Sequence, residues 1–178
     1  MARNIKFYIN DTVIENVTEF KYLGWIISAD DYDDGAVNFN ITKASKTWYR
    51  MYRILSRDTA DSRVMARFYL AIIQAKLLYG SETWVLSQRT LKRLESFHNR
   101  CARIIAHRPI HPLPDGTWEY PPTEEVLDFC GLSDISTYIA RRKTRLLNRY
   151  AEPESPLYNL CKNSTPIGNG ARRQMWWT

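Results

Sequence analysis

The chain has 178 residues, of which 44% are hydrophobic and 13% aromatic, and its formal net charge is +6. This composition excludes a disordered chain, and the length is sufficient for one domain with a sizeable core. No apolar run approaches the roughly 20 residues that cross a bilayer, and the first residues lack the apolar region of a signal peptide. We therefore expect an intracellular protein that is not secreted and has no membrane-spanning segment.

The charge is unevenly distributed along the chain. Residues 41–108 carry 14 basic and 4 acidic groups, and residues 134–178 carry 8 and 3. The remaining segments are net acidic, with 3 basic and 7 acidic groups in residues 1–40 and 5 acidic groups in residues 109–133. Positive charge gathered on two stretches is the pattern of a protein that binds a polyanion, and nucleic acid is the predicted partner.

The first 35 residues have the composition of short antiparallel strands. Apolar and polar residues alternate from Ile5 to Ile9, and the next two residues, Asn10 and Asp11, favour a turn. A second apolar run, FKYLGWIIS, begins at Phe20. These patterns predict a β-hairpin or meander in residues 1–35, which needs another element to cover its apolar face.

Three amphipathic helices are predicted within residues 36–108. The first covers residues 36–56 and follows two cap residues, Asp33 and Asp34. The second begins at a cap, Ser62, and ends near Gly80, and its predicted inward residues are Val64, Phe68, Ile72, Ala75 and Leu78. The third follows Ser87, and its apolar stripe is Leu91, Leu94, His98, Cys101 and Ile105. Short connections between them predict a three-helix bundle.

The rest of the chain is predicted to be less regular. Residues 109–122 contain five prolines and an Asp-Gly turn, which indicates an ordered but irregular surface loop and a boundary. A helical extension over residues 123–151 contains a short helix ending at Gly131 and a longer one capped by Ser133. Residues 152–178 lack periodicity and predict an irregular tail. The predicted fold class is α+β, mostly α: an N-terminal antiparallel hairpin or meander, a small helical bundle and the tail.

A row of basic residues lies along the first predicted helix, which has no Asp or Glu from Val37 to Arg57: Lys43, Lys46, Arg50, Arg53 and Arg57. Steps of three and four residues place all five on one side of the helix. Such a row can contact several phosphates of a nucleic-acid backbone without reading bases. The alternative is a solvated helix face, but such a face usually carries charges of both signs. We interpret the row as a nucleic-acid-binding surface.

Two groups of polar residues have the composition of metal sites but not the spacing. The acidic run DDYDDG, from Asp30 to Gly35, would place Tyr32 at a ligand position of an EF-hand loop and Ile41 where the bidentate Glu belongs. We interpret this run as a solvated turn and helix cap. The second group fits common zinc spacings poorly, and its first two members continue a helical apolar stripe: His98, Cys101, His107 and His111. No metal or other cofactor is expected.

Two further patterns bear on chemistry. The chain contains none of the short signatures of hydrolases, nucleotide-binding loops or metalloproteases, so no catalytic residues are assigned. Its three cysteines are widely spaced and form no CxxC pair: Cys101, Cys130 and Cys161. A disulfide framework is therefore not expected, and we interpret the cysteines as small apolar residues.

Two segments together resemble the region just after the catalytic palm in reverse transcriptases of non-LTR (LINE-type) retrotransposons. They are FKYLG, from Phe20 to Gly24, and LLYGSETW, from Leu77 to Trp84. The resemblance runs from about Ile5 to Ala106 and resumes weakly in residues 124–132 and 138–151. It implies that the basic helix is part of a thumb that faces an RNA/DNA duplex. It also implies that four residues lie at a primer grip: Phe20, Tyr22, Leu23 and Gly24.

The same resemblance implies that the catalytic aspartates lie upstream of FKYLG. A catalytic pair of that family would need an aromatic residue two positions before Asp33, where this chain has Asp31. We therefore expect a non-catalytic fragment or reused remnant that binds RNA or RNA/DNA duplex backbone. The alternative is a structural subunit of a larger protein or ribonucleoprotein assembly, built from a reused thumb domain. In either case, a protein partner is expected to cover the N-terminal strands.

Overall fold

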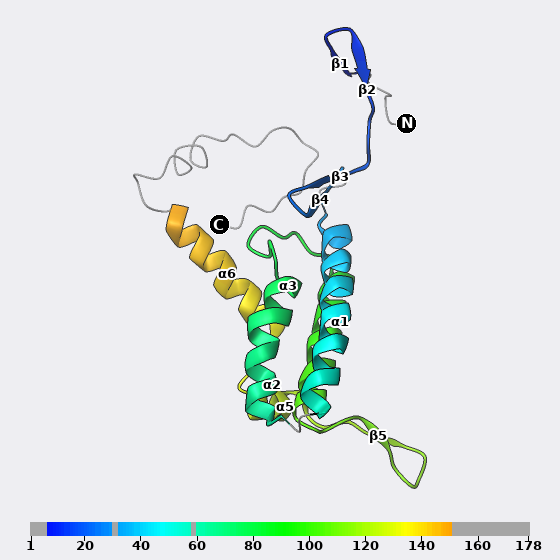
Figure 1. The fold of residues 1–178 in the computed structure, drawn as a ribbon, viewed down its shortest axis with the longest axis vertical. Coiled ribbons are helices and arrows are strands. Elements are labelled where there is room, and N and C mark those ends of the chain that lie inside the picture. The colour runs from blue at the N-terminus through cyan, green and yellow to red at the C-terminus, as the bar shows by residue number, and fades with distance from the viewer. Residues whose placement is uncertain (1–6, 30–31, 58–59, 151–178) are drawn as a thin grey trace.

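The computed structural model describes residues 7–29, 32–57 and 60–150. It shows an α+β chain in which antiparallel strand pairs precede a set of packed helices (Figure 1), and this confirms the predicted fold class. The expected irregular tail, residues 152–178, lies outside the described residues. Among the helices that the structure describes, none has both the length and the apolar character needed to cross a bilayer.

The first hairpin consists of β1 (Phe7–Ile9) and β2 (Thr12–Ile14), which pair antiparallel. Its turn is formed by Asn10 and Asp11, as predicted, with φ angles of 45° and 62°. Asn and Asp enter the left-handed region more readily than other non-glycine residues, which suits them to a two-residue hairpin loop. Every residue of both strands is exposed, and Figure 1 shows this hairpin standing away from the helices.

The second hairpin, β3 (Glu19–Tyr22) and β4 (Trp25–Ser28), is attached to the helices through Trp25. The ring of Trp25 stacks on that of Trp84, with centroids 6.0 Å apart. It also lies against Gly80, where an added Cβ would be only 2.7 Å from Cζ3 of the Trp25 ring. Gly80 has a φ of +77°, so both its backbone conformation and this close approach favour glycine.

The centre of the helical body is formed by α1 (Asp34–Arg57), α4 (Gln88–Ile105) and the helical stretch between them. That stretch consists of α2 (Ser62–Phe68), the π-helical segment η1 (Tyr69–Gln74) and α3 (Ala75–Leu77). α1 packs against η1, α3 and α4. The side chain of Ser87, after which this helix was predicted to begin, accepts a hydrogen bond from the backbone N–H of Thr90 at 3.2 Å and caps α4.

The inward face of the second helical stretch differs from the prediction. Its buried residues are Met65, Ala66, Tyr69, Ile73, Gln74, Leu77 and Leu78. Of the predicted stripe only Leu78 is buried, whereas Val64, Phe68 and Ala75 are exposed and Ile72 is half-buried. The stretch has apolar residues on most of its sides. The spacing of these residues is therefore compatible with two different buried faces, offset from each other by about one residue along the sequence. The π-helical turn of η1 further shifts the phase of the side chains.

The carboxylates of Asp33 and Asp34 join two distant parts of the chain. The Asp33 carbonyl accepts a hydrogen bond from the N–H of Val37, as a cap residue does. Its carboxylate accepts one from the N–H of Val85 at 2.8 Å, and the Asp34 carboxylate accepts one from the Ser87 hydroxyl at 2.7 Å. The expected solvated turn is therefore a tertiary contact that holds the start of α1 against the segment before α4.

Ser62 also has a different role from the predicted helix cap. α2 begins at Ser62 itself, and the residue before the helix is Asp61. The Ser62 hydroxyl donates a hydrogen bond to the carbonyl of Ile105 at 2.7 Å, at the end of α4. The serine thus connects two helix termini.

The proline-containing loop is more regular than expected. Within residues 109–122, β5 (His111–Pro112) and β6 (Trp118–Glu119) form a short antiparallel pair. The carboxylate of Asp115 accepts hydrogen bonds from the N–H and the hydroxyl of Thr117, at 2.9 and 2.6 Å. These local bonds close the turn and allow the pairing, which corrects the prediction of an irregular loop.

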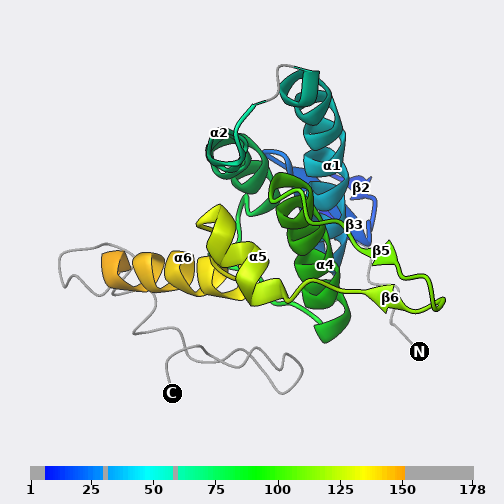
Figure 2. The ribbon, with the colours of Figure 1, turned by 90° about the horizontal axis from the view of Figure 1, so that it is seen from below.

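A single hydrophobic core joins all the described helices. α5 (Thr123–Cys130) ends at Gly131, whose φ of 64° confirms the predicted stop, and α6 (Ile135–Tyr150) follows. Val126 and Ile139 are buried in the same core as the residues of α1 and α4, so residues on both sides of the loop share it. Figure 2 shows α6 and the β5–β6 hairpin extending from opposite sides of the body.

Candidate nucleic-acid interface

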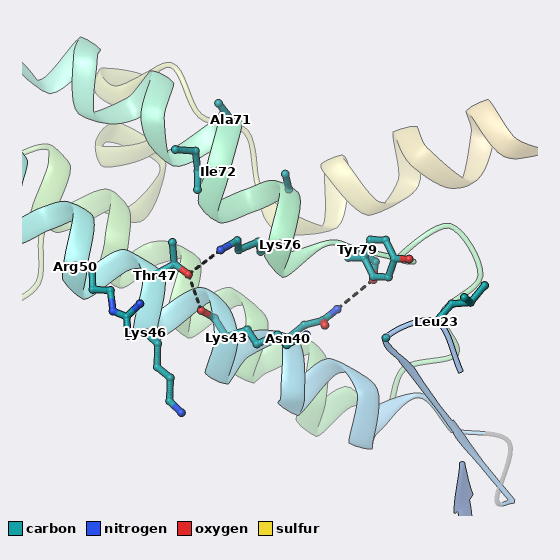
Figure 3. A pocket seen from close by; sticks show the side chains of 12 residues that line it. Leu23, Asn40, Lys43, Lys46, Thr47, Arg50, Ala71, Ile72, Lys76 and Tyr79 are labelled. Carbon is teal, nitrogen blue, oxygen red and sulfur yellow. Dashed lines mark hydrogen bonds between the residues drawn. The ribbon is translucent and has the colours of Figure 1, made fainter. Parts of the chain in front are cut away.

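A groove of about 720 Å³ lies between α1 and the η1–α3 stretch. We call it the α1–α3 groove. Among the described residues that line it, none is Asp or Glu and four are basic: Lys43, Lys46, Arg50 and Lys76. Leu23 and Gly24, in the turn between β3 and β4, line it as well, and Figure 3 shows Leu23 at one end. The groove is therefore positively charged and is built from three elements that are distant in sequence.

The five basic residues predicted from the first helix all have exposed side chains: Lys43, Lys46, Arg50, Arg53 and Arg57. The buried side of α1 is formed by Val37, Asn40, Ala44 and Trp48, together with Ala36. We call the exposed row the basic face of α1. Its first three members line the groove, whereas Arg53 and Arg57 lie beyond it toward the end of the helix. The Lys46 amine points away from α3 (Figure 3).

Lys21 of β3 extends the basic face of α1, although the sequence analysis did not assign it. Its Nζ lies 5.2 Å from the ring centroid of Phe39, and the Nζ of Lys43 lies 4.3 Å from the same centroid. Cation–π attraction thus brings a strand lysine and a helix lysine to one ring. Only the folding of β3 over the start of α1 creates this pair, so helical spacing alone could not reveal it.

Lys76 of α3 is a second basic residue that the sequence analysis did not assign. Its Nζ donates a hydrogen bond to Oγ1 of Thr47 at 3.1 Å, and that hydroxyl donates to the carbonyl of Lys43 at 3.0 Å. The amine therefore reaches across the groove to α1 (Figure 3). The sequence does contain a feature that singles out Lys76, because it is the only charged residue between Arg67 and Glu82.

The four residues assigned to a primer grip divide into two pairs. Leu23 and Gly24 line the groove, whereas Phe20 and Tyr22 are exposed and do not. Leu23 has a φ of 47° and an exposed fraction of 78%. Both the left-handed backbone and the exposure are unfavourable for leucine, and such unfavourable conformations cluster at functional sites.

Tyr79 lies at the same end of the groove as Leu23. Its carbonyl accepts a hydrogen bond at 3.1 Å from Nδ2 of Asn40, a buried residue of α1. The Tyr79 side chain remains 53% exposed, and its ring centroid lies 6.5 Å from that of Trp25. A half-exposed aromatic ring on a firmly held backbone is well placed to contact a ligand in the groove.

Two basic residues of α6 stabilise the bend that follows α3. Arg142 donates to the Leu78 carbonyl at 2.9 Å and to the Glu82 carboxylate at 3.2 Å. Lys143 donates to the Trp84 carbonyl at 2.9 Å, and burial lowers the pKa of its amine. Part of the positive charge in residues 134–178 therefore makes internal contacts.

The histidines and cysteines of the zinc-like string do not form one group. His98 and Cys101 are fully buried, as predicted for core residues, whereas His107 and His111 are exposed. Burial raises the pKa of the Cys101 thiol to about 12, so this cysteine is not a reactive thiolate. Cys130 is also buried and free, and Cys161 lies outside the described residues. In the part of the chain that the structure describes, no three His, Cys, Asp or Glu residues are grouped to hold a metal.

Comparison with protein-family models, with curated proteins and with solved structures finds no match for this chain. The surfaces that remain to be explained are the basic face of α1, the groove beside it and the exposed apolar hairpins. Their physical properties are the basis on which a function can be assigned.

Proposed function

We propose that this chain is a non-catalytic nucleic-acid-binding module that holds the backbone of RNA or of an RNA/DNA duplex along the basic face of α1. The observation that carries the proposal is the exposure of all five cations on a helix with no acidic residue after its first turn. Lys21 and Lys76 add positive charge from neighbouring elements. Phosphates would be contacted by long, flexible side chains, so binding would be independent of sequence.

The length of the basic face suits several successive phosphates. From Lys43 to Arg57 the helix rises roughly 21 Å at 1.5 Å per residue. One strand of a duplex carries a phosphate about every 3.4 Å along its axis, so the row spans several of them. The face is therefore long enough for five cations to neutralise about five phosphates.

The resemblance to the primer grip and thumb of LINE-type reverse transcriptases supports the same proposal. Leu23 and Gly24 belong to FKYLG, and Tyr79 belongs to LLYGSETW. These residues line the same groove, next to three members of the basic face of α1. A primer grip beside a thumb would require this proximity. We propose that the module acts on a duplex and performs no polymerisation itself.

The test is the salt dependence of duplex binding. If five phosphates are neutralised, the logarithm of the binding constant should fall with the logarithm of salt concentration at a slope of about −4.5. Replacing Arg53→Gln and Arg57→Gln together should reduce the slope by about 2, because each arginine releases about one counterion. Fluorescence anisotropy titrations with RNA/DNA duplexes of unrelated sequence would measure both quantities.

A charge-matched control is provided by α6. Arg141 and Arg145 are exposed, and replacing both by Gln removes the same net charge from another surface. The control variant should keep a slope close to that of the unmodified protein. Equal slopes in the two double variants, or no duplex binding at low salt, would contradict the proposal.

A second candidate function is a structural subunit of a larger assembly, and the exposed apolar hairpins favour it. Phe20 and Ile27 face each other across β3 and β4, and both are more than half exposed. Phe7 and Ile9 of β1 are exposed as well. Apolar surface of this kind commonly contacts another protein. This second function does not require duplex binding, so it would stand if the titrations showed none.

A further inference from the structure

We propose that the α1–α3 groove holds an unpaired base of the bound nucleic acid, stacked on Tyr79, while the basic face of α1 holds the duplex backbone. The inference rests on the proposed function and specifies which part of the ligand the groove accepts. An unpaired base is planar, largely apolar on its faces and joined through its sugar to a phosphate. A site for it therefore needs both an apolar surface and positive charge.

The groove has both of these properties. Its apolar lining comes from the hairpin turn and from the η1–α3 stretch: Leu23, Ala71, Ile72, Ala75 and Tyr79. Four basic residues also line the groove, and its volume of about 720 Å³ is typical of sites for small organic ligands. Proteins bind single-stranded nucleic acids by the same combination of a positive groove and aromatic side chains on which bases stack.

The position of the apolar lining is set by the phase of the second helical stretch. Spacing predicted that Ile72 and Ala75 face the core, but the fold places Tyr69 and Ile73 there instead. Ile72 and Ala75 consequently line the groove, where the small side chain of Ala75 leaves space. Ile72 also packs partly against the core, whereas the exposed Ala75 and the half-exposed ring of Tyr79 give the groove an apolar surface that binding of a backbone alone does not need.

Tyr79 is held in place by its backbone, with its ring left accessible. The Asn40 amide bonds its carbonyl, and the next residue, Gly80, is packed against the ring of Trp25. The ring itself remains half exposed at the groove. A fixed backbone reduces the entropy lost when the ring is immobilised by a ligand. The positive charge of Lys43 and Lys76 favours an anionic aromatic ligand such as a nucleotide.

The experiment compares three forms of one RNA/DNA duplex in anisotropy titrations with the full chain: blunt, with a short unpaired DNA overhang, and with the same overhang lacking its bases. The last two carry equal charge, so any difference between them reports on base contacts. We expect the base-bearing overhang to bind about tenfold more tightly than the abasic one. Tyr79→Leu should remove this difference, and Tyr79→Phe should retain it, because stacking needs the ring and not the hydroxyl.

Matched variants separate the groove from the rest of the surface. Tyr120 is exposed and lies outside the groove, so Tyr120→Leu should leave the difference unchanged. Ala75 is exposed and lines the groove, so Ala75→Leu should reduce the difference by filling the space without altering the core. This second variant decides the outcome if Tyr79→Leu proves to be poorly folded by circular dichroism.

The outcomes distinguish the two proposals. Equal affinity of the unmodified protein for base-bearing and abasic overhangs, with blunt duplex still bound, would overturn the groove inference and leave the duplex proposal standing. Weakening of all three duplexes by Tyr79→Leu to the same extent would also overturn it, because Tyr79 would then contact the duplex. Absence of binding to every duplex at low salt would reject the proposed function and this inference together.

Discussion

His98 shows how a single buried polar residue connects three parts of the helical body. Its Nδ1 accepts a hydrogen bond from the Tyr69 hydroxyl at 2.7 Å, and its Nε2 lies 3.0 Å from the Ser133 carbonyl, to which it donates. Both bonds are made by the neutral ring. Burial is the largest influence on His98 and lowers the pKa of its ring, although the Ser133 carbonyl and the nearby Asp134 favour the charged form.

The pKa of His98 predicts a pH-dependent stability. As pH falls through the ordinary histidine pKa near 6.5, the unfolded chain binds a proton that the folded chain does not yet bind. The free energy of unfolding should therefore decrease as pH falls below about 7 and should lose its His98-dependent slope above pH 7. Urea unfolding monitored by circular dichroism at several pH values would measure this.

Two variants make the assignment to His98 specific. His98→Phe should be less stable by roughly 1–3 kcal/mol at neutral pH, because the Ser133 carbonyl loses its donor, and its pH slope should be shallower. His107→Gln changes an exposed histidine and should keep the slope of the unmodified protein. A slope in His98→Phe equal to that of the unmodified protein would show that other groups cause the pH dependence.

At the scale of elements, the β3–β4 hairpin depends on its contact with the bend after α3. Trp25 packs against both Gly80 and Trp84, and the backbone of the bend is held by Arg142 and Lys143. The hairpin therefore docks on a segment that α6 supports from another side. This chain of contacts places Leu23 and Tyr79 at the end of the groove.

Gly80→Ala is expected to weaken this docking. The new Cβ would clash with the Trp25 ring and would also occupy a left-handed backbone conformation, so the free energy of unfolding should fall by roughly 2–4 kcal/mol. Gly116→Ala is the matched control, because Gly116 has a similar φ of +80° but no atom of the described residues lies within 4 Å of the added Cβ. It should lose only about 1 kcal/mol. Equal losses in the two variants would show that the Trp25 contact is unimportant for stability.

At the scale of the whole molecule, the chain separates a well-packed helical body from exposed apolar hairpins. Each described helix contributes to the core, whereas β1 and β2 are exposed along their whole length. From the sequence we expected a protein partner to cover the apolar residues of the N-terminal strands. Trp25 is an exception, because it is partly buried against the bend. Phe20 and Ile27 remain exposed, so we propose that a protein partner covers them.

The double variant Phe20→Thr, Ile27→Thr tests whether this surface is needed for folding. Both side chains are about half exposed, so the free energy of unfolding should change by less than about 1 kcal/mol, while binding of a hydrophobic dye should decrease. Trp25→Thr should instead cost roughly 3 kcal/mol, because it removes a ring packed against Trp84. A native chain that binds no dye, or equal losses of stability in the two variants, would argue against an exposed docking surface.

Local patterns in the sequence were sufficient for much of the fold. The Asn10–Asp11 turn, the start of α4 after Ser87, the stop at Gly131 and the burial of His98 in α4 were all predicted, and the structure confirms each one. These features depend on backbone preferences and on one helical stripe that is clearly amphipathic. The exposure of the basic face of α1 follows from the same regularity.

Only the tertiary structure decided which side of the second helical stretch is buried and where the polar residues at helix ends make their bonds. In that stretch apolar residues lie on most sides, so the packing of Tyr69 against His98 selects a face that spacing left undetermined. That selection turns Ile72 and Ala75 toward the groove. It also brings Lys76 to α1, while the hairpin brings Leu23 and Lys21. The sequence by itself determined a basic helix; the groove beside it exists because elements distant in sequence share one core.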